Sequence, residues 1–184
     1  MSGHVCFARR RRALVGALLA SVAVVVGLPF RVTAAPCWVP PVVAMVADPY
    51  REPPCPWCAG NRGIEYRLAG SVAIRAAASG RVVFSGTVVG VHYIVIQLAN
   101  GWRHTYGHLI STSIDVGDAV MAGRDIGRAA DVFFFGLRVG DVYRDPAPFI
   151  GVERRRPRLI PADGTPPRPA PPPRLQCPQH GTPR

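Results

Sequence analysis

The residues from Tyr93 to His108 read YIVIQLANGWRHTYGH, and this stretch decides the fold class of the chain. A run of mainly β-branched side chains, Tyr93 to Leu98, is followed by Asn100-Gly101 and then by a second run from Trp102. Asn-Gly between two such runs is a strong signal for a β-hairpin, because both residues accept the positive φ of a tight turn. The stretch therefore predicts two antiparallel strands.

Short runs of the same kind lie on both sides of this hairpin, and Gly or Asn separates them. No stretch after the N-terminal segment has helical periodicity. Closely spaced short strands with tight turns favour an antiparallel sandwich or a partly open barrel. We therefore predict an all-β core. The further strands are expected at Val72–Arg75, Arg81–Gly86, Phe133–Val139 and Val142–Arg144.

The first 34 residues predict export. Arg9 to Arg12 form a basic region, Ala13 to Leu28 form an uncharged apolar run, and Val32-Thr33-Ala34 fits the small-x-small rule for signal cleavage. The apolar run is shorter than the roughly 20 residues that a membrane span needs. We therefore expect residues 1–34 to be a signal peptide and the protein to be secreted or in the cell envelope. A retained N-terminal membrane anchor is the alternative.

The net charge of +11 belongs mainly to the ends of the chain. All 22 basic residues are Arg, and five of them lie in the predicted signal peptide. Seven more lie between Arg154 and Arg184, where Asp163 is the only acid. The segment from Ala35 to Glu153 carries ten residues of each sign. The basic composition therefore does not predict a nucleic-acid-binding face, and we expect no nucleic acid as a partner.

Composition divides the rest of the chain into three parts. Residues 35–57 are rich in Pro and apolar side chains and predict an extended arm that packs on the core. Residues 58–152 form the predicted β core. Residues 153–184 are dense in Pro and Arg and predict a disordered tail with polyproline II character. Such a basic tail can contact anionic wall polymers or lipid; a solvated tail without a dedicated partner is the alternative.

Four cysteines follow the signal peptide, and an even number in an exported protein predicts disulfides. Cys55-Pro56-Trp57-Cys58 also has the spacing of thioredoxin-like redox sites. Those sites lie at the start of a helix, which the surrounding prolines exclude, so we favour structural bridges. Three pairings are possible. We expect Cys37 to bond to Cys55 or Cys58, and Cys177 to be unpaired or bonded elsewhere.

Several blocks between Cys58 and Gly151 occur in the order found in one peptidase family. The blocks are Asn61–Tyr66, Val72–Gly86, Arg103–Leu109, Val116–Gly127, Phe135–Leu137 and Asp145-Pro146. Together they resemble the lysostaphin-type (LytM-like) zinc endopeptidases, which cut peptidoglycan cross-bridges. The resemblance implies a compact antiparallel β core with an open groove.

The resemblance also implies that the zinc site has been replaced. The family holds zinc through an H-x-x-x-D motif and the second His of an H-x-H motif, and a water molecule bound at the open position becomes the nucleophile. The first motif aligns with Asn61 and Glu65, and the second with Val132 and Phe134. An amide, a longer carboxylate and an apolar ring do not make this ligand set. Only Glu65 and His108, which matches a groove histidine of the family, remain.

A strand from Trp102 to His108 places Trp102, His104, Tyr106 and His108 on one face, because side chains alternate along a strand. The resemblance makes this the groove face, where aromatic rings beside hydrogen-bond donors suit sugars and stem peptides. A half-buried strand without a ligand is the alternative. The expected groove residues are Asn61, Arg62, Glu65, His104, Tyr106 and His108.

We therefore predict an exported, non-catalytic peptidase-like domain that binds peptidoglycan or regulates a cell-wall hydrolase. No cofactor is expected. One alternative is an active peptidoglycan metalloendopeptidase whose rebuilt zinc site uses Glu65, His104 and His108, with His108 catalytic. His104 and His108 are roughly 13 Å apart on an extended strand, so the strand would have to bend for both to bind one ion. A structural envelope protein is the second alternative.

Overall fold

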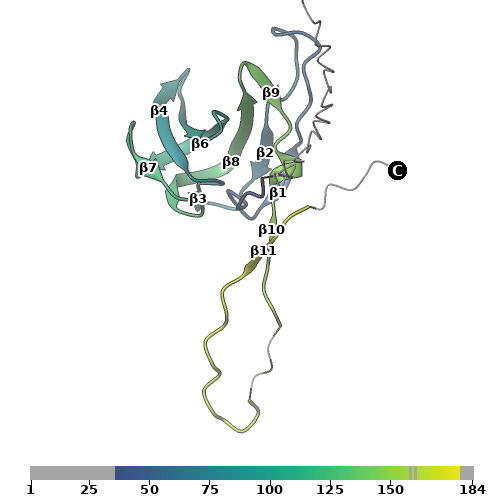
Figure 1. Ribbon diagram of the computed structural model, residues 1–184, viewed down its shortest axis with the longest axis vertical. Helices are drawn as coiled ribbons and strands as arrows, with labels where there is room; N and C mark the ends of the chain where they lie inside the picture. The colour runs from purple at the N-terminus through teal and green to yellow at the C-terminus, as the bar shows by residue number, and fades with distance from the viewer. Residues whose placement is uncertain (1–35, 158, 160, 179–184) are drawn as a thin grey trace, which may run out of the picture. The chain divides into compact units, whose positions relative to one another are not determined.

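The computed structural model describes residues 36–157, 159 and 161–178, and the regular secondary structure of these residues is almost entirely β (Figure 1). Nine strands form one antiparallel sheet in the order β1-β2-β8-β6-β5-β4-β7, with β3 and β9 also paired to β8. The order ends at β1 and β7, so the sheet is open, and the all-β prediction is confirmed. The elements are β1 Met45–Asp48, β2 Ile64–Arg67, β3 Val72–Arg75, β4 Gly80–Val88, β5 Val91–Leu98, β6 Arg103–Thr112, β7 Ala119–Val120, β8 Asp125–Val139, β9 Val142–Arg144, the 3-10 helix η1 Ala147–Phe149, β10 Val152–Arg154 and β11 Arg174–Gln176.

The predicted hairpin is present as β5 and β6. Gly101 has a φ of 82°, and its N–H donates to the carbonyl of Leu98 at 3.0 Å. The paired residues include Ile96 with His104 and Ile94 with Tyr106. The Asn-Gly turn therefore fixes the register of the two central strands.

Strand β8 joins the two halves of the sheet, and it is longer than the predicted run from Phe133. Its first part pairs with β3 and its later part with β2, while β6 lies along its other edge. The change of partner occurs at Asp131, which has a φ of 65° and accepts a hydrogen bond from the N–H of Leu68. Apart from Gly, mainly Asn, Asp and His adopt this conformation, so the break in β8 lies at a residue type that tolerates it.

One face of the sheet forms the core, and the N-terminal arm covers it. Trp38 is 3% exposed, and its ring lies 4.2 Å from that of His104 and 4.8 Å from that of Phe149. Strand β1 then extends the sheet by pairing with β2. The start of the predicted arm, at Trp38, therefore packs on the core.

The predicted disulfide pairing is wrong. Cys37 bonds to Cys177, and Cys55 bonds to Cys58. The hydrogen bond from the N–H of Gly151 to the carbonyl of Trp38 places the start of β10 beside the arm. Val152 of β10 pairs with Gln176 of β11, so the next residue, Cys177, is brought to Cys37.

The tail from residue 153 was predicted to be disordered, and the pairing of β10 with β11 corrects this in part. An ion pair of 2.8 Å between Arg75 and Glu153 joins β10 to β3. The described residues between β10 and β11 form a long loop without helix or strand (Figure 1). The described part of the tail is therefore a loop closed at its base by two short strands, and a disulfide from Cys177 ties it to Cys37.

In the described part of the chain, no helix has the length and apolar character needed to cross a membrane. The predicted signal peptide and its anchor alternative, residues 1–34, lie outside the described residues.

Candidate functional site

The face of the sheet opposite the core carries a groove of about 650 Å³, which we call the aromatic groove. A bulge between Val82 and Phe84 in β4 places Val83 and Phe84 next to each other on this face, 41% and 39% exposed. Strands β5, β6, β8 and β9 complete the floor and walls. The lining residues are Val83, Phe84, Val88, Tyr93, Val95, Gln97, Arg103, Thr105, Arg138 and Tyr143.

Two arginines and no carboxylate line the aromatic groove. Arg138 is already engaged, since its Nη2 lies 2.7 Å from Oδ1 of Asp141 and its guanidinium is 5.6 Å from the ring of Tyr143. Arg103 makes no side-chain hydrogen bond or ion pair to any residue that the structure describes. Its guanidinium is therefore available for a carboxylate, which it can bind through two parallel N–H donors.

A second concavity, of about 510 Å³, contains Glu65, His92, His108 and Asp131, and we call it the polar pocket. His108 has a φ of 60°, and the register of β6 shifts between Gly107 and Leu109. This bulge turns His108 away from the core. The rings of His108 and Tyr93 are 6.5 Å apart, so the polar pocket adjoins the aromatic groove. Val132, which aligns with a catalytic His of the family, also lines it.

Asn61, aligned with the first zinc ligand, is buried and bonded to the backbone. Its Nδ2 donates to the carbonyls of Asp48 and Pro49, both at 3.2 Å, and its Oδ1 accepts from the N–H of Gly63 at 3.3 Å. All three partners are backbone groups. The amide therefore joins the arm to the start of β2 and does not face a metal.

Phe134 stands where the resemblance places an imidazole ligand, and its ring fills the space above two glycines. It lies opposite Glu65 in the pairing of β2 with β8. A Cβ added to Gly63 would come within 2.5 Å of the Phe134 ring, and one added to Gly136 within 2.9 Å. The described residues contain no group of three His, Cys, Asp or Glu side chains able to hold a metal ion. The residues present therefore do not fit the family's zinc.

His104 and Tyr106 do not line the groove, so their prediction as groove residues is wrong. Both are fully buried on the core face, where the Tyr106 hydroxyl accepts from the N–H of Ala77 at 2.8 Å. The sequence predicted correctly that Trp102, His104 and Tyr106 share one face of the strand. That face, however, is the one buried in the core and not the one that lines the groove. The bulge then places His108 elsewhere. The alternative zinc site of Glu65, His104 and His108 is therefore contradicted.

Burial lowers the pKa of the His104 imidazole to about 3, so the folded protein holds it neutral. The unfolded chain takes up a proton here below the ordinary pKa of 6.5. The neutral His104 ring therefore makes its full contribution to the free energy of unfolding above pH 6.5. This contribution is lost as the pH falls toward 3. We expect the free energy of unfolding, relative to that of His104→Leu, to fall by about 2 kcal/mol between about pH 7 and about pH 4.5. Urea unfolding of both proteins measures this difference, and parallel pH profiles would contradict it.

Arg62 does not line the aromatic groove; it lines a neighbouring concavity that shares Tyr143 with it. Its guanidinium is 5.8 Å from the ring of Tyr143, and its Nη2 donates to the carbonyl of Pro56 at 2.6 Å. None of the six predicted groove residues lines the aromatic groove. Arg62 lines the neighbouring concavity, Glu65 and His108 line the polar pocket, and Asn61, His104 and Tyr106 are buried. The sequence reasoning missed the residues of β6 that alternate with the buried ones, namely Arg103 and Thr105.

Comparison with known proteins supports the assignment of the fold. Residues 59–132 match the model of peptidase family M23. No curated protein matches the sequence. Csd3 of Helicobacter pylori superposes with a TM-score of 0.57 at 23% identity, over 64% of this chain and 35% of that chain. The catalytic domain of lysostaphin from Staphylococcus simulans gives a TM-score of 0.51 at 23% identity, over 58% of this chain and 91% of that chain.

A chain of the SpoIIQ–SpoIIIAH pore-forming complex gives a TM-score of 0.56 at 18% identity, over 64% of this chain and 92% of that chain. At these identities the likeness concerns the fold, and this chain spans about a third of the Csd3 chain. The resemblance to lysostaphin-type peptidases found in the sequence is confirmed.

Proposed function

We propose that this chain, an M23-like protein with the lysostaphin-type fold, is a non-catalytic module that binds peptidoglycan peptides in the aromatic groove. The observation that carries the proposal is the combination of an open groove with a ligand position filled by the ring of Phe134. A fold that has a groove beside this position but lacks the metal ligands can bind a peptide without hydrolysing it.

The chemistry of the groove suits a short peptide that carries carboxylates. Phe84 and Tyr93 offer rings to aliphatic side chains and to sugar faces, while Gln97 and Thr105 offer hydrogen bonds to amides. Arg103 offers a free guanidinium to a carboxylate. In the adjoining polar pocket, the carboxylates of Glu65 and Asp131 suit the ammonium group of such a peptide.

Hydrolysis is not expected, because the family's reaction needs a metal with an open coordination position for water. The side-chain amide of Asn61 is hydrogen-bonded to backbone groups, and the ring of Phe134 has no lone pair with which to bind a metal. His108 and Glu65 share the polar pocket with His92 and Asp131, but among the described residues no three such side chains are grouped so that they could hold a metal ion.

The first test uses the protein without its predicted signal peptide, purified under oxidising conditions and without a metal-binding tag. We expect it to sediment with purified peptidoglycan, to contain far less than one zinc per chain, and to release no muropeptides. Near-stoichiometric zinc with chelator-sensitive release would show an active peptidase and overturn the proposal. Failure to sediment would also overturn it, in favour of a structural envelope role.

The second test places the binding in the groove. Arg103→Ala and Tyr93→Ala are each expected to weaken binding to soluble muropeptides about tenfold, since a charge-assisted hydrogen bond or a ring contact contributes about 1.4 kcal/mol. Arg67→Ala is the matched control, because Arg67 is an exposed arginine of β2 that does not line the groove. Titration calorimetry measures the affinities. Equal losses in Arg67→Ala and Arg103→Ala would show attraction by net charge instead of groove binding.

A further inference from the structure

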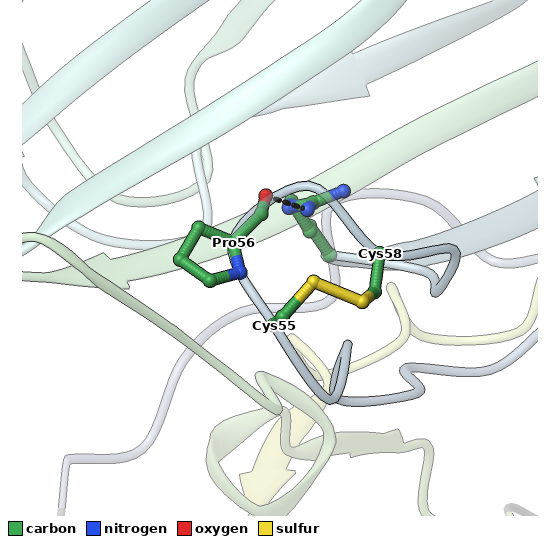
Figure 2. The surroundings of a disulfide bond; sticks show 4 residues. Cys55, Pro56 and Cys58 are labelled. Atoms are coloured by element: carbon green, nitrogen blue, oxygen red, sulfur yellow. Dashed lines mark hydrogen bonds between the residues drawn. A yellow bond between two sulfur atoms is a disulfide. The ribbon is translucent and has the colours of Figure 1, made fainter.

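The Cys55–Cys58 disulfide closes a small loop at the protein surface (Figure 2). The N–H of Cys58 donates to the carbonyl of Cys55 at 3.1 Å, so the four residues form a tight turn. Trp57, between the cysteines, is 89% exposed, and both cysteines are partly exposed. The bridge can therefore be reached by another molecule.

The expected contribution of this bridge to stability is much smaller than that of the Cys37–Cys177 bridge. A disulfide stabilises mainly by restricting the unfolded chain, and the effect grows with the length of the loop that it closes. Cys37 and Cys177 are 140 residues apart, whereas Cys55 and Cys58 are three apart. The long-range bridge already ties the arm to the tail. A second, very short bridge adds little to that constraint.

Cys55 also lines a concavity of about 370 Å³ that has the features of a thiol-exchange site. Tyr50 and Tyr143 give it aromatic walls, and Arg62 places a guanidinium in it. Figure 2 shows the hydrogen bond from this guanidinium to the carbonyl of Pro56, the residue after Cys55. A neighbouring arginine favours the thiolate form of cysteine and so makes it a better leaving group.

Two carboxylates oppose this effect in part. Glu52 and Asp141 line the same concavity, but Asp141 is paired with Arg138 at 2.7 Å. Thioredoxin-like sites obtain their positive field from a helix N-terminus. The loop here lies on no helix, and Arg62 supplies the positive charge in its place.

We propose that Cys55–Cys58 is an exchange disulfide that oxidises dithiols of exported polypeptides. A substrate thiolate attacks Sγ of Cys55, which breaks the Cys55–Cys58 bond and releases the Cys58 thiolate to take up a proton. The second substrate thiol, deprotonated, then attacks the substrate sulfur of the mixed disulfide, and Cys55 leaves as a thiolate beside Arg62. The substrate gains a disulfide, and two electrons and two protons pass to Cys55 and Cys58. The activity does not depend on the peptide-binding groove.

The test uses the full chain with Cys6→Ser, so that only the two disulfides contribute thiols. The oxidised protein is mixed with a synthetic two-cysteine peptide, and both disulfides are followed by alkylation and mass spectrometry. We expect one peptide disulfide per chain, with Cys55–Cys58 reduced about 100-fold faster than Cys37–Cys177. Equal rates for the two bridges, or reduction only after unfolding, would overturn the proposal.

Two variants separate exchange from a structural role. In Cys58→Ser, a peptide with a single cysteine, supplied as its mixed disulfide with 2-nitro-5-thiobenzoate, is expected to be trapped on Cys55 as a stable mixed disulfide, because nitrothiobenzoate leaves and no second thiol remains to release the peptide. In the same background, Arg62→Gln is expected to slow trapping about tenfold and to raise the pKa of the Cys55 thiol, measured by alkylation against pH. Arg67→Gln is the control for net charge. An unchanged trapping rate and thiol pKa in Arg62→Gln would refute the role of Arg62, and the absence of any trapping on Cys55 would refute the exchange.

Discussion

Replacing Cys37 and Cys177 together by alanine is expected to lower the free energy of unfolding by about 4 kcal/mol. The bridge joins residues 140 apart, and the loss of loop-closure entropy in the unfolded chain is large for a loop of this size. For a domain of this size, the midpoint of thermal unfolding should then fall by about 10 °C. Calorimetry or circular dichroism measures the shift.

The internal control is Cys55→Ala with Cys58→Ala, which removes a bridge that spans only three residues. Its cost should be about 2 kcal/mol or less, because the constraint on the unfolded chain is much smaller. Equal losses in the two double variants would show that local contacts, and not loop length, set the contribution of each disulfide.

Trp38→Ala is expected to lower the free energy of unfolding by about 4 kcal/mol, which is typical when a buried Trp is truncated. The Trp38 side chain is 3% exposed and contacts the rings of Trp102, His104, Phe135 and Phe149. Its removal leaves a cavity at the point where the arm covers the core. Urea unfolding followed by fluorescence or circular dichroism measures the loss.

Trp57→Ala is the matched control, since Trp57 is 89% exposed and its removal should change stability by less than about 0.5 kcal/mol. Trp38 is also the neighbour of Cys37, so the two sites should not be independent. We expect the combination of Trp38→Ala with the loss of the Cys37–Cys177 bridge to cost less than the sum of the separate losses. Strict additivity would mean that the disulfide does not hold the arm on the core.

Local sequence patterns determined the strands themselves. Val72–Arg75 and Val142–Arg144 begin and end where the runs of strand-forming residues predict, and the Asn-Gly turn sets the central hairpin. These features depend on neighbouring residues only, through backbone preferences and side-chain alternation. That Asn61 and Phe134 stand where the resemblance places zinc ligands was equally visible, because it is a matter of residue type at aligned positions.

The tertiary structure decided which face of each strand is buried. Alternation places His104 and Tyr106 on one side of β6, but only the arm, with Trp38, makes that side the core. The bulge at His108 and the break at Asp131 depend on how β6 and β8 pair across the sheet. The pairing of Cys37 with Cys177 likewise follows from the contact of β10 with β11, which no local pattern specifies. Strand formation is set by short-range preferences, whereas burial and cross-linking depend on residues far apart in the chain that come together only when it folds.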